Sequence, residues 1–169
     1  VYGGLADVSA NVTAVPSEIG VVTPGYGPVA VPQNSSQTFT AETRAYETAN
    51  IRYACKGWVV SNATEEVARG DTTEATFNAG TKALTFYWIW GDCEKGLDIN
   101  VPDHAKVVVD GVEYSETSSV WGLDGDSATF TVVPDDGYEF LCWEGEVPYG
   151  KSTSNPLVLA IADMRKVTP

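Results

Sequence analysis

The chain has 169 residues, of which 43% are hydrophobic and 20% charged, and its 23 acidic and 10 basic side chains give a formal net charge of −13. No apolar run approaches the roughly 20 residues that cross a bilayer, and no basic segment leads into an apolar one, so we expect neither membrane insertion nor a signal peptide. So few cations leave no basic stripe for phosphates, which excludes nucleic acid and anionic lipid as partners.

Residue usage predicts an all-β chain, or a β-rich one with at most one short helix. Val, Thr, Tyr, Trp and Phe are common, and there are 16 glycines and 9 prolines, whereas residues that favour helices are scarce. The length fits two small domains or one larger sandwich. We expect two tandem small β modules, and leave open whether each is β-sandwich-like or β-grasp-like.

In the first half, residues 1–4 are expected to form a frayed leader. The best helical candidate is Glu42–Ala49, but Thr43, Tyr46 and Thr48 are poor helix formers. We therefore predict a loop there.

In the second half, Asp110-Gly111 separates two short strands, Lys106–Val109 and Val112–Tyr114. Asp-Gly accepts the positive φ angles of a type I′ turn, so this segment predicts a β-hairpin. A further strand over Ala128–Val133 is expected to end at the Pro134–Gly137 turn and to resume over Tyr138–Trp143.

The two halves match loosely, which predicts an internal repeat. The matches are Phe39 with Phe130 (offset 91), Trp58 with Trp143 (offset 85), Lys82 with Lys166 (offset 84), and Leu5–Val8 with Leu97–Val101. We interpret the four matched aromatic residues as structural anchors. The polar, glycine-bounded segment Gly91–Gly96 is the expected junction. It divides the chain into a first module over 1–92 and a second over 93–169.

A strand ending in Pro134-Asp135-Asp136-Gly137-Tyr138, followed by Trp143 and then by Asn155–Leu159, characterises the second module. This pattern resembles the divergent form of the internalin-type B-repeat over roughly residues 97 to 169. The first half, with Cys55–Trp58 and Leu84–Trp90, looks like a more diverged relative. The resemblance implies tandem modules of large secreted or surface-attached bacterial proteins, which serve as stalks, spacers or adhesive units beside neighbouring domains.

Two features depart from that family. Cys142 stands where the family commonly has glycine before the Trp, and the chain stops at Val167–Pro169, where members continue through a closing strand. We therefore expect the second module to be truncated before that strand, with an exposed sheet edge.

Reaction chemistry has little support in the sequence. The single histidine, His104, lies in a turn-like segment without a Ser or Cys motif beside it, so we interpret it as a solvated turn residue and not as a general base. No glycine-rich phosphate loop and no His-Glu-x-x-His occurs. We expect no enzyme, no catalytic residues and no cofactor.

The three cysteines, Cys55, Cys93 and Cys142, are too few and too far apart for a sulfur-only zinc site. Cys55 and Cys142 take nearly matching places on strands beside a Trp, so we expect both to be buried and distant from each other. Cys93 lies in the junction and could reach either one. A disulfide involving Cys93 stays open.

Acidic clusters are candidates for binding calcium, which prefers oxygen ligands. They are Asp124 with Asp126, Asp135 with Asp136, and Asp98. No glycine and distal glutamate of a calcium loop follow them, and turns require the same residue types. We favour solvated turns and expect no metal site.

Tryptophans are the strongest candidates for ligand binding. Strand alternation places Phe86, Trp88 and Trp90 on one face, which would stack on sugar rings if it were exposed. We favour burial of that face in a core, since large aromatics dominate burial in small domains. Trp121, in a Ser/Gly-rich stretch, is the tryptophan most expected to be exposed.

These observations predict a non-catalytic tandem spacer or adhesion module of a larger secreted or surface-exposed bacterial protein. Its partners would be neighbouring domains of the same protein, and a glycan or a host or surface protein. The alternative is a carbohydrate-binding module that uses an aromatic ladder of Trp88 and Trp90, with Trp121.

Overall fold

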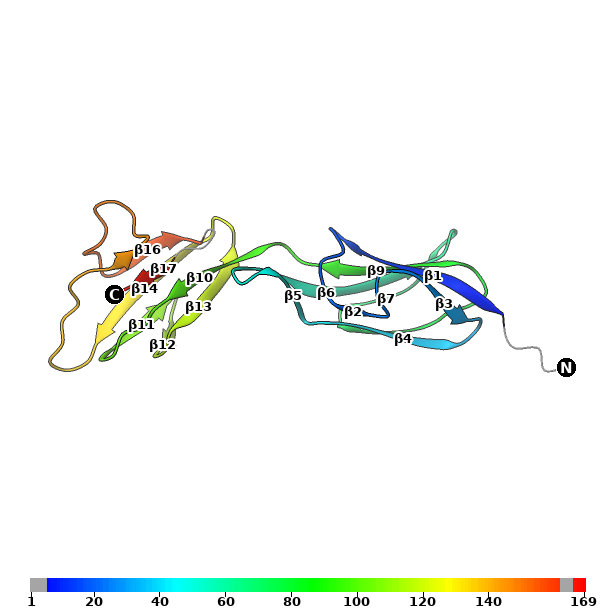
Figure 1. Cartoon of the computed structure of the whole chain (residues 1–169), viewed down its shortest axis with the longest axis horizontal. Coiled ribbons are helices and arrows are strands. Elements are labelled where there is room, and N and C mark those ends of the chain that lie inside the picture. The colour runs from blue at the N-terminus through cyan, green and yellow to red at the C-terminus, as the bar shows by residue number, and fades with distance from the viewer. Residues whose placement is uncertain (1–5, 162–165) are drawn as a thin grey trace. The chain divides into compact units, whose positions relative to one another are not determined.

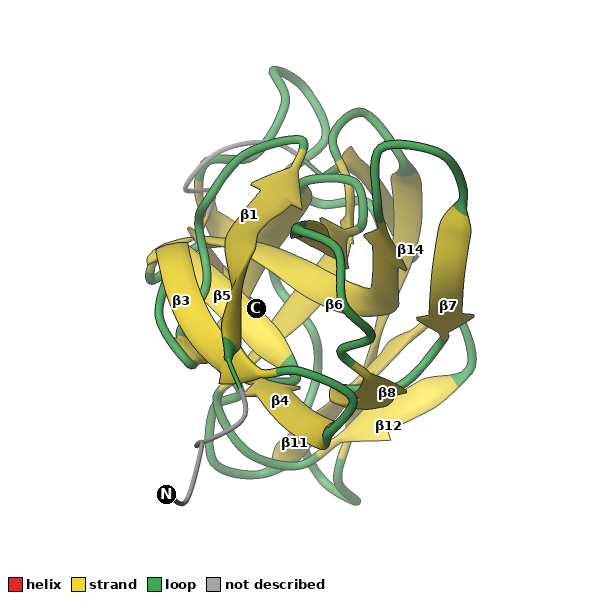
Figure 2. Cartoon of the chain, turned by 90° about the vertical axis from the view of Figure 1, so that its right-hand side faces the viewer, coloured by secondary structure: helices red, strands yellow, loops and turns green. Residues whose placement is uncertain are grey.

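The computed structural model describes residues 6–161 and 166–169. These residues contain no helix and are 58% strand, arranged in several sheets (Figure 2). The expected all-β, sandwich-like class is therefore confirmed. The expected leader at residues 1–4 lies outside the described residues, as does Leu5 of the matched segment Leu5–Val8. Within the described residues no helix could span a membrane.

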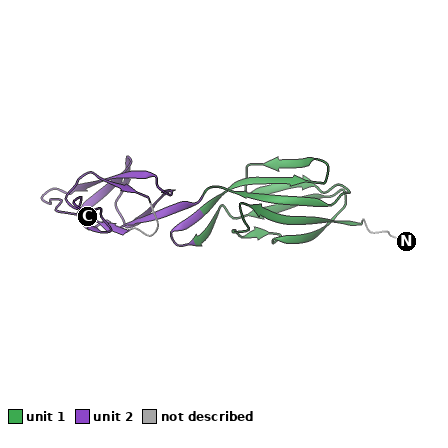
Figure 3. Ribbon diagram, turned by 90° about the horizontal axis from the view of Figure 1, so that it is seen from above, with its two compact units in different colours: residues 1–47, 53–92 green, residues 48–52, 93–169 purple. Residues whose placement is uncertain are grey.

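The chain divides into two compact units, each with its own set of contacts (Figure 3). Unit 1 comprises residues 1–47 and 53–92, and unit 2 comprises residues 48–52 and 93–169. The division at Asp92 and Cys93 falls inside the glycine-bounded segment 91–96. The short segment 48–52 belongs to unit 2, although it lies within the first half of the sequence.

Unit 1 is built from two sheets (Figure 1). Its strands are β1 (Asp7–Val15), β2 (Val22–Thr23), β3 (Gly27–Pro32), β4 (Ser36–Ala41), β5 (Arg44–Thr48), β6 (Ile51–Ser61, of which residues 51 and 52 belong to unit 2), β7 (Glu66–Gly70), β8 (Glu74–Asn78) and β9 (Leu84–Trp90). One sheet has the order β6-β9-β1-β3, with β5 and β7 also paired to β6. The other has the order β2-β4-β8.

Unit 2 also has two sheets. Its strands are β10 (Glu94–Ile99), β11 (Ala105–Val109), β12 (Val112–Tyr114), β13 (Ser118–Leu123), β14 (Ser127–Pro134), β15 (Glu144–Gly145), β16 (Leu157–Ala160) and β17 (Lys166–Thr168). One sheet has the order β15-β17-β10, with β13 on the other side of β10, and the second has the order β12-β11-β14-β16.

The two units share one order of strand pairing. In unit 1 the first strand, β1, pairs antiparallel with β3 and parallel with the last strand, β9. In unit 2 the first strand, β10, likewise pairs antiparallel with β13 and parallel with the last strand, β17. The last strand also pairs antiparallel with β6 in unit 1 and β15 in unit 2. In the second sheet, β2-β4-β8 corresponds to β11-β14-β16, with every pair antiparallel. The units therefore have the same topology, to which unit 1 adds β5 and β7 and unit 2 adds β12.

The core of unit 1 follows the two-residue period of its strands. Alternate residues of β1 and β9 are buried: Val8, Ala10, Val12, Ala14, Leu84, Phe86, Trp88 and Trp90. They pack against Phe39 of β4, Phe77 of β8 and Trp58 of β6. The ring of Phe86 lies 5.0 Å from that of Phe39 and 5.9 Å from that of Trp58, so aromatic rings join the two sheets.

Unit 2 has a separate core around Phe130 and Trp143. Their rings meet edge to face at 6.4 Å, and Phe140 packs on Trp143 at 5.7 Å. The indole N–H of Trp143 donates to the Ser154 carbonyl at 2.8 Å, which satisfies the buried polar atom of this anchor. All four anchors predicted from the sequence, Phe39, Trp58, Phe130 and Trp143, are thus buried in a core.

The hairpin over Lys106–Tyr114 is confirmed. Strands β11 and β12 pair antiparallel across Asp110 and Gly111, whose φ angles are 46° and 87°. Both central residues therefore take the left-handed conformation that a type I′ turn requires.

Three local predictions are wrong. Residues 44–48 form strand β5, because Thr and Tyr suit a strand next to β6. Residues 138–143 are not a strand, because turn and loop partners take their backbone groups: Tyr138 N–H donates to Asp135 and Trp143 N–H to Ser152. The last strand is not an open edge, because β17 pairs with both β10 and β15.

Candidate functional site

The aromatic face of β9 is not exposed. Trp88 is 0% and Trp90 3% exposed, and Phe86 is 0% exposed. Strand β9 lies between β6 and β1, and its aromatic face is covered by Phe39 and Phe77 of the opposite sheet. The alternative expectation, a sugar-stacking ladder of Trp88 and Trp90, is therefore wrong.

The buried indole groups differ in how their N–H is satisfied. Trp90 Nε1 donates to the Tyr26 hydroxyl at 3.3 Å. In the described part of the chain, the indole nitrogens of Trp58 and Trp88 have no hydrogen-bond partner. An unpaired buried N–H costs free energy.

Trp121 is half-buried in unit 2 and makes a specific contact. The Arg52 guanidinium lies 4.2 Å from the centre of the Trp121 ring, and Arg52 Nε is bonded to Glu94 Oε2 at 2.6 Å. The ring also lies against Gly96, its partner in the β10–β13 register. Arg52, Glu94 and Gly96 thus hold Trp121, so the tryptophan most expected to be exposed is half-buried by contacts within unit 2.

This contact can be tested with Arg52→Lys. We expect unit 2 to lose about 1 kcal/mol of stability, because lysine lacks the planar group that stacks on the indole while bonding Glu94. Urea unfolding followed by tryptophan fluorescence measures the loss.

Arg69→Lys is the matched control. Arg69 bonds Glu66, but their side chains are 70% and 41% exposed, so its replacement should change stability by less than about 0.5 kcal/mol. Equal effects of the two substitutions would show that the contact with Trp121 does not stabilise unit 2.

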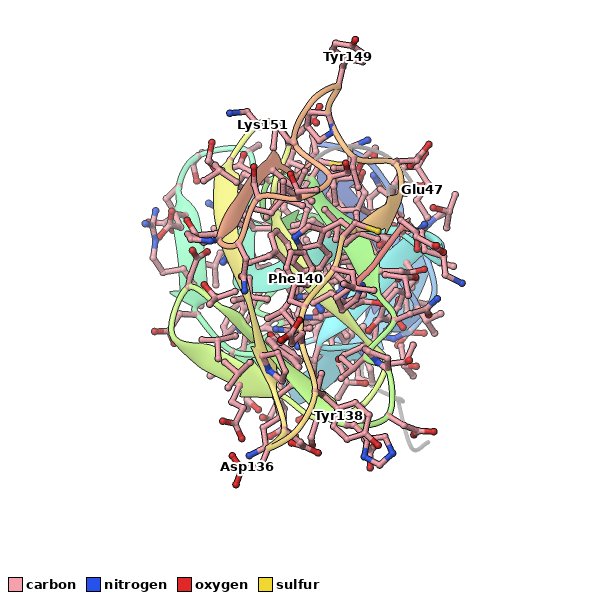
Figure 4. All side chains as sticks on the ribbon, turned by 90° about the vertical axis from the view of Figure 1, so that its left-hand side faces the viewer. Glu47, Asp136, Tyr138, Phe140, Tyr149 and Lys151 are labelled. Atoms are coloured by element: carbon pink, nitrogen blue, oxygen red, sulfur yellow. The ribbon has the colours of Figure 1, made fainter. Side chains whose placement is uncertain are left out.

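Unit 2 has a surface hollow of about 260 Å³ beside the loop that follows β14. Pro102, His104, Pro134, Tyr138 and Leu141 are among its lining residues. In Figure 4, Tyr138 and Phe140 lie along this loop, which begins at the turn marked by Asp136. The sequence pattern did not reveal this site because it predicted a strand over Tyr138–Trp143. A regular strand would have alternated its side chains between a core and solvent.

Apolar side chains remain accessible at the hollow. Leu141 is 78% and Tyr138 52% exposed, while Phe140 is half-buried against Trp143. Tyr149, on another loop, is fully exposed at the loop tip and does not line the hollow (Figure 4). Exposed apolar residues that cluster at a concave surface favour contact with another molecule.

His104 is a turn residue, with a φ angle of 64°. Its ring stacks on Tyr138 at 4.3 Å, and its Nδ1 lies 3.9 Å from Asp135 Oδ2, with both side chains 55% exposed. The sequence prediction of a solvated turn residue is confirmed. Cys142 lines the same hollow, but within the described residues no hydrogen bond joins it to His104.

The three cysteines are free thiols. Cys55 and Cys142 are half-buried, so the expected burial is only partial. Cys142 also lies in the irregular loop and not on a strand. Partial burial raises the pKa of the Cys55 thiol, which keeps it protonated and slows its reaction with electrophiles.

Carboxylates of the acidic clusters bond to turns and neighbouring strands. Asp126 accepts from the Leu123 N–H at 3.2 Å, and Asp98 accepts from the Ser119 hydroxyl at 2.7 Å. Among the described residues, no three His, Cys, Asp or Glu side chains converge as metal ligands would. The Asp126 contact agrees with the turn role that the sequence favoured, whereas Asp98 lies within strand β10.

Comparison with known proteins gave no relative: no family model, no curated protein and no solved structure matches this chain.

Proposed function

We propose that the chain is a non-catalytic tandem spacer or adhesion module of a larger secreted or surface-exposed bacterial protein. The main support is that the first and last strands run parallel in both units: β1 beside β9 in unit 1, and β10 beside β17 in unit 2. A chain that enters at the start of one strand and leaves at the end of its parallel neighbour enters and leaves a unit at opposite ends.

This connection lets each unit add length between whatever precedes and follows it. The nine residues of β1 alone extend about 30 Å at roughly 3.3 Å per residue. An antiparallel pair of terminal strands would instead return the chain to the end at which it entered, and such a unit would add little length.

Each unit also has the internal support that a spacer needs. The core around Phe86 and the core around Phe130 are formed within their own units. The shared topology and the sequence resemblance to internalin-type B-repeats both favour two copies of one module. The net charge of −13 opposes self-association of neighbouring chains.

A surface-display experiment tests the spacer function. The chain is placed between a bacterial surface anchor and a peptide epitope, on cells that carry a thick capsule. Antibody access to the epitope, measured by flow cytometry, should increase from no insert to the chain and to two copies in series. A flexible Gly/Ser linker of equal residue number is the control. Access that does not depend on copy number would contradict the proposal.

The adhesion role has separate support in the hollow of unit 2. Leu141 and Tyr138 supply accessible apolar surface, and Asp103, Glu139 and Glu144 also line the hollow, with no Lys or Arg among the lining residues. Charge complementarity favours a protein segment that presents an apolar side chain flanked by Lys or Arg.

A peptide with Leu-Phe flanked by pairs of lysines is a direct probe of this surface. Its binding should shift the amide resonances of residues 138–142 in an NMR titration, and Leu141→Ser should weaken it severalfold. Val112→Ser is the matched control, because Val112 is also exposed in unit 2, at 55%, but does not line the hollow. Equal loss in both variants would indicate nonspecific attraction to an acidic surface.

A further inference from the structure

We propose that unit 1 bears mechanical load: the parallel pairing of β1 with β9 resists stretching of the chain as a shear clamp. This inference rests on the proposed spacer function, because a spacer between an anchor and a bound partner transmits tension through its own backbone.

The clamp lies on the path that tension takes through unit 1. Tension enters through the start of β1 and leaves through the end of β9. These strands are parallel and paired over six positions, from Ala10 with Leu84 to Val15 with Ile89. The force then acts along the strands and loads their evenly spaced hydrogen bonds together, so no single bond breaks first.

Side-chain packing adds to this resistance. Ala10, Val12 and Ala14 of β1 and the aromatic residues of β9 alternate into one core. A slip of one residue would turn every side chain of β1 to the opposite face. Sliding the two strands past each other therefore disrupts the core as well as the hydrogen bonds.

Unit 2 has a corresponding parallel pairing. Within the described residues, β10 and β17 are paired at Asp98 with Lys166 and at Ile99 with Val167. The Asn100 N–H also donates to the Val167 carbonyl at 3.0 Å, and Asn100 Nδ2 to the Thr168 hydroxyl at 3.0 Å. Substitutions within unit 1 are therefore needed to assign its unfolding event.

Single-molecule stretching of the full chain between handles at its two ends tests the proposal. Two unfolding events are expected, one for each unit. Two substitutions then assign the event of unit 1. Thr13 pairs with Tyr87 of β9 and lies beyond the β1–β3 register, whereas Val29 of β3 pairs with Ala10 at the other edge of β1.

Thr13→Pro should lower the force of one event, that of unit 1, and leave the other unchanged, because proline disrupts the pairing of β1 with β9. Val29→Pro should leave both forces near those of the parent, although it disrupts the pairing of β1 with β3. Urea unfolding of both variants reports their thermodynamic cost. Equal changes in force for the two variants would overturn the clamp.

A change of pulling direction tests the clamp without weakening the fold. Thr81 is exposed and precedes β9, so handles at the N-terminus and at Thr81→Cys pull β1 and β9 apart from the same end. Cys55, Cys93 and Cys142 are replaced by serine in every sample. Unit 1 should then open pair by pair, at less than half the force measured along the strands. Equal force in both directions would also overturn the clamp.

The display and stretching experiments fail independently. Epitope access that rises with copy number, together with low and direction-independent forces, would retain the spacer and reject the clamp. Suppose instead that epitope access does not change with copy number, while the unfolding force of unit 1 is high and depends on the pulling direction. That result would reject the spacer function and retain the clamp as a property of the fold.

Discussion

Phe86→Ala is expected to unfold or nearly unfold unit 1 while leaving unit 2 folded. Phe86 is 0% exposed, and its ring lies 5.0 to 5.9 Å from those of Phe39, Trp58, Phe77 and Trp88. Truncation removes the buried ring and leaves a cavity, which costs about 3 to 5 kcal/mol. That loss is a large share of the roughly 5 to 15 kcal/mol that stabilises a typical domain.

Urea unfolding followed by circular dichroism and tryptophan fluorescence measures this effect. The transition of unit 1, which contains Trp58, Trp88 and Trp90, should move to much lower urea. The reciprocal variant is Phe130→Ala, which removes a 0% exposed ring of the other core and should shift only unit 2. If either substitution moved both transitions equally, the two cores would not be independent.

Local sequence signals predicted much of the secondary structure. The Asp110-Gly111 turn and the alternation of residues 84–90 were readable because a turn type and a two-residue period depend on neighbouring residues. Strand β5 and the irregular segment 138–143 were not readable in this way. Tertiary pairing with β6 decides the first, and the turn and loop bonds to Asp135 and Ser152 decide the second.

The candidate site shows the same limit. Alternation establishes that Trp88 and Trp90 share a face, but it does not say whether that face meets a core or solvent, and the opposite sheet decides this. The contact between Arg52 and Trp121 joins residues far apart in sequence, so no local sequence pattern predicts it. The parallel pairing of terminal strands is also nonlocal, yet the functional proposal depends on it.

Gly57→Ala is the second substitution with a large expected effect, again confined to unit 1. Gly57 has a φ angle of +129° and lies where the β6–β9 register shifts, which marks a bulge. A Cβ atom there would collide with the Gly70 carbonyl oxygen and lie 2.8 Å from the Asp71 Cα. Both obstacles are backbone atoms, so rotation of a side chain cannot relieve them. We expect a loss of at least about 3 kcal/mol, measured by urea unfolding.

Gly27→Ala separates the two causes of that loss. Gly27 also belongs to unit 1 and has a φ angle of +105°, but a Cβ atom there would meet nothing within 4 Å. Its replacement should therefore cost only the conformational strain, about 1 to 2 kcal/mol. The difference between the variants measures how closely β6 approaches the end of β7, an approach that places Gly70 against the Trp58 indole. Equal losses would mean that the backbone at Gly70 yields easily and that glycine is required at position 57 for its φ angle alone.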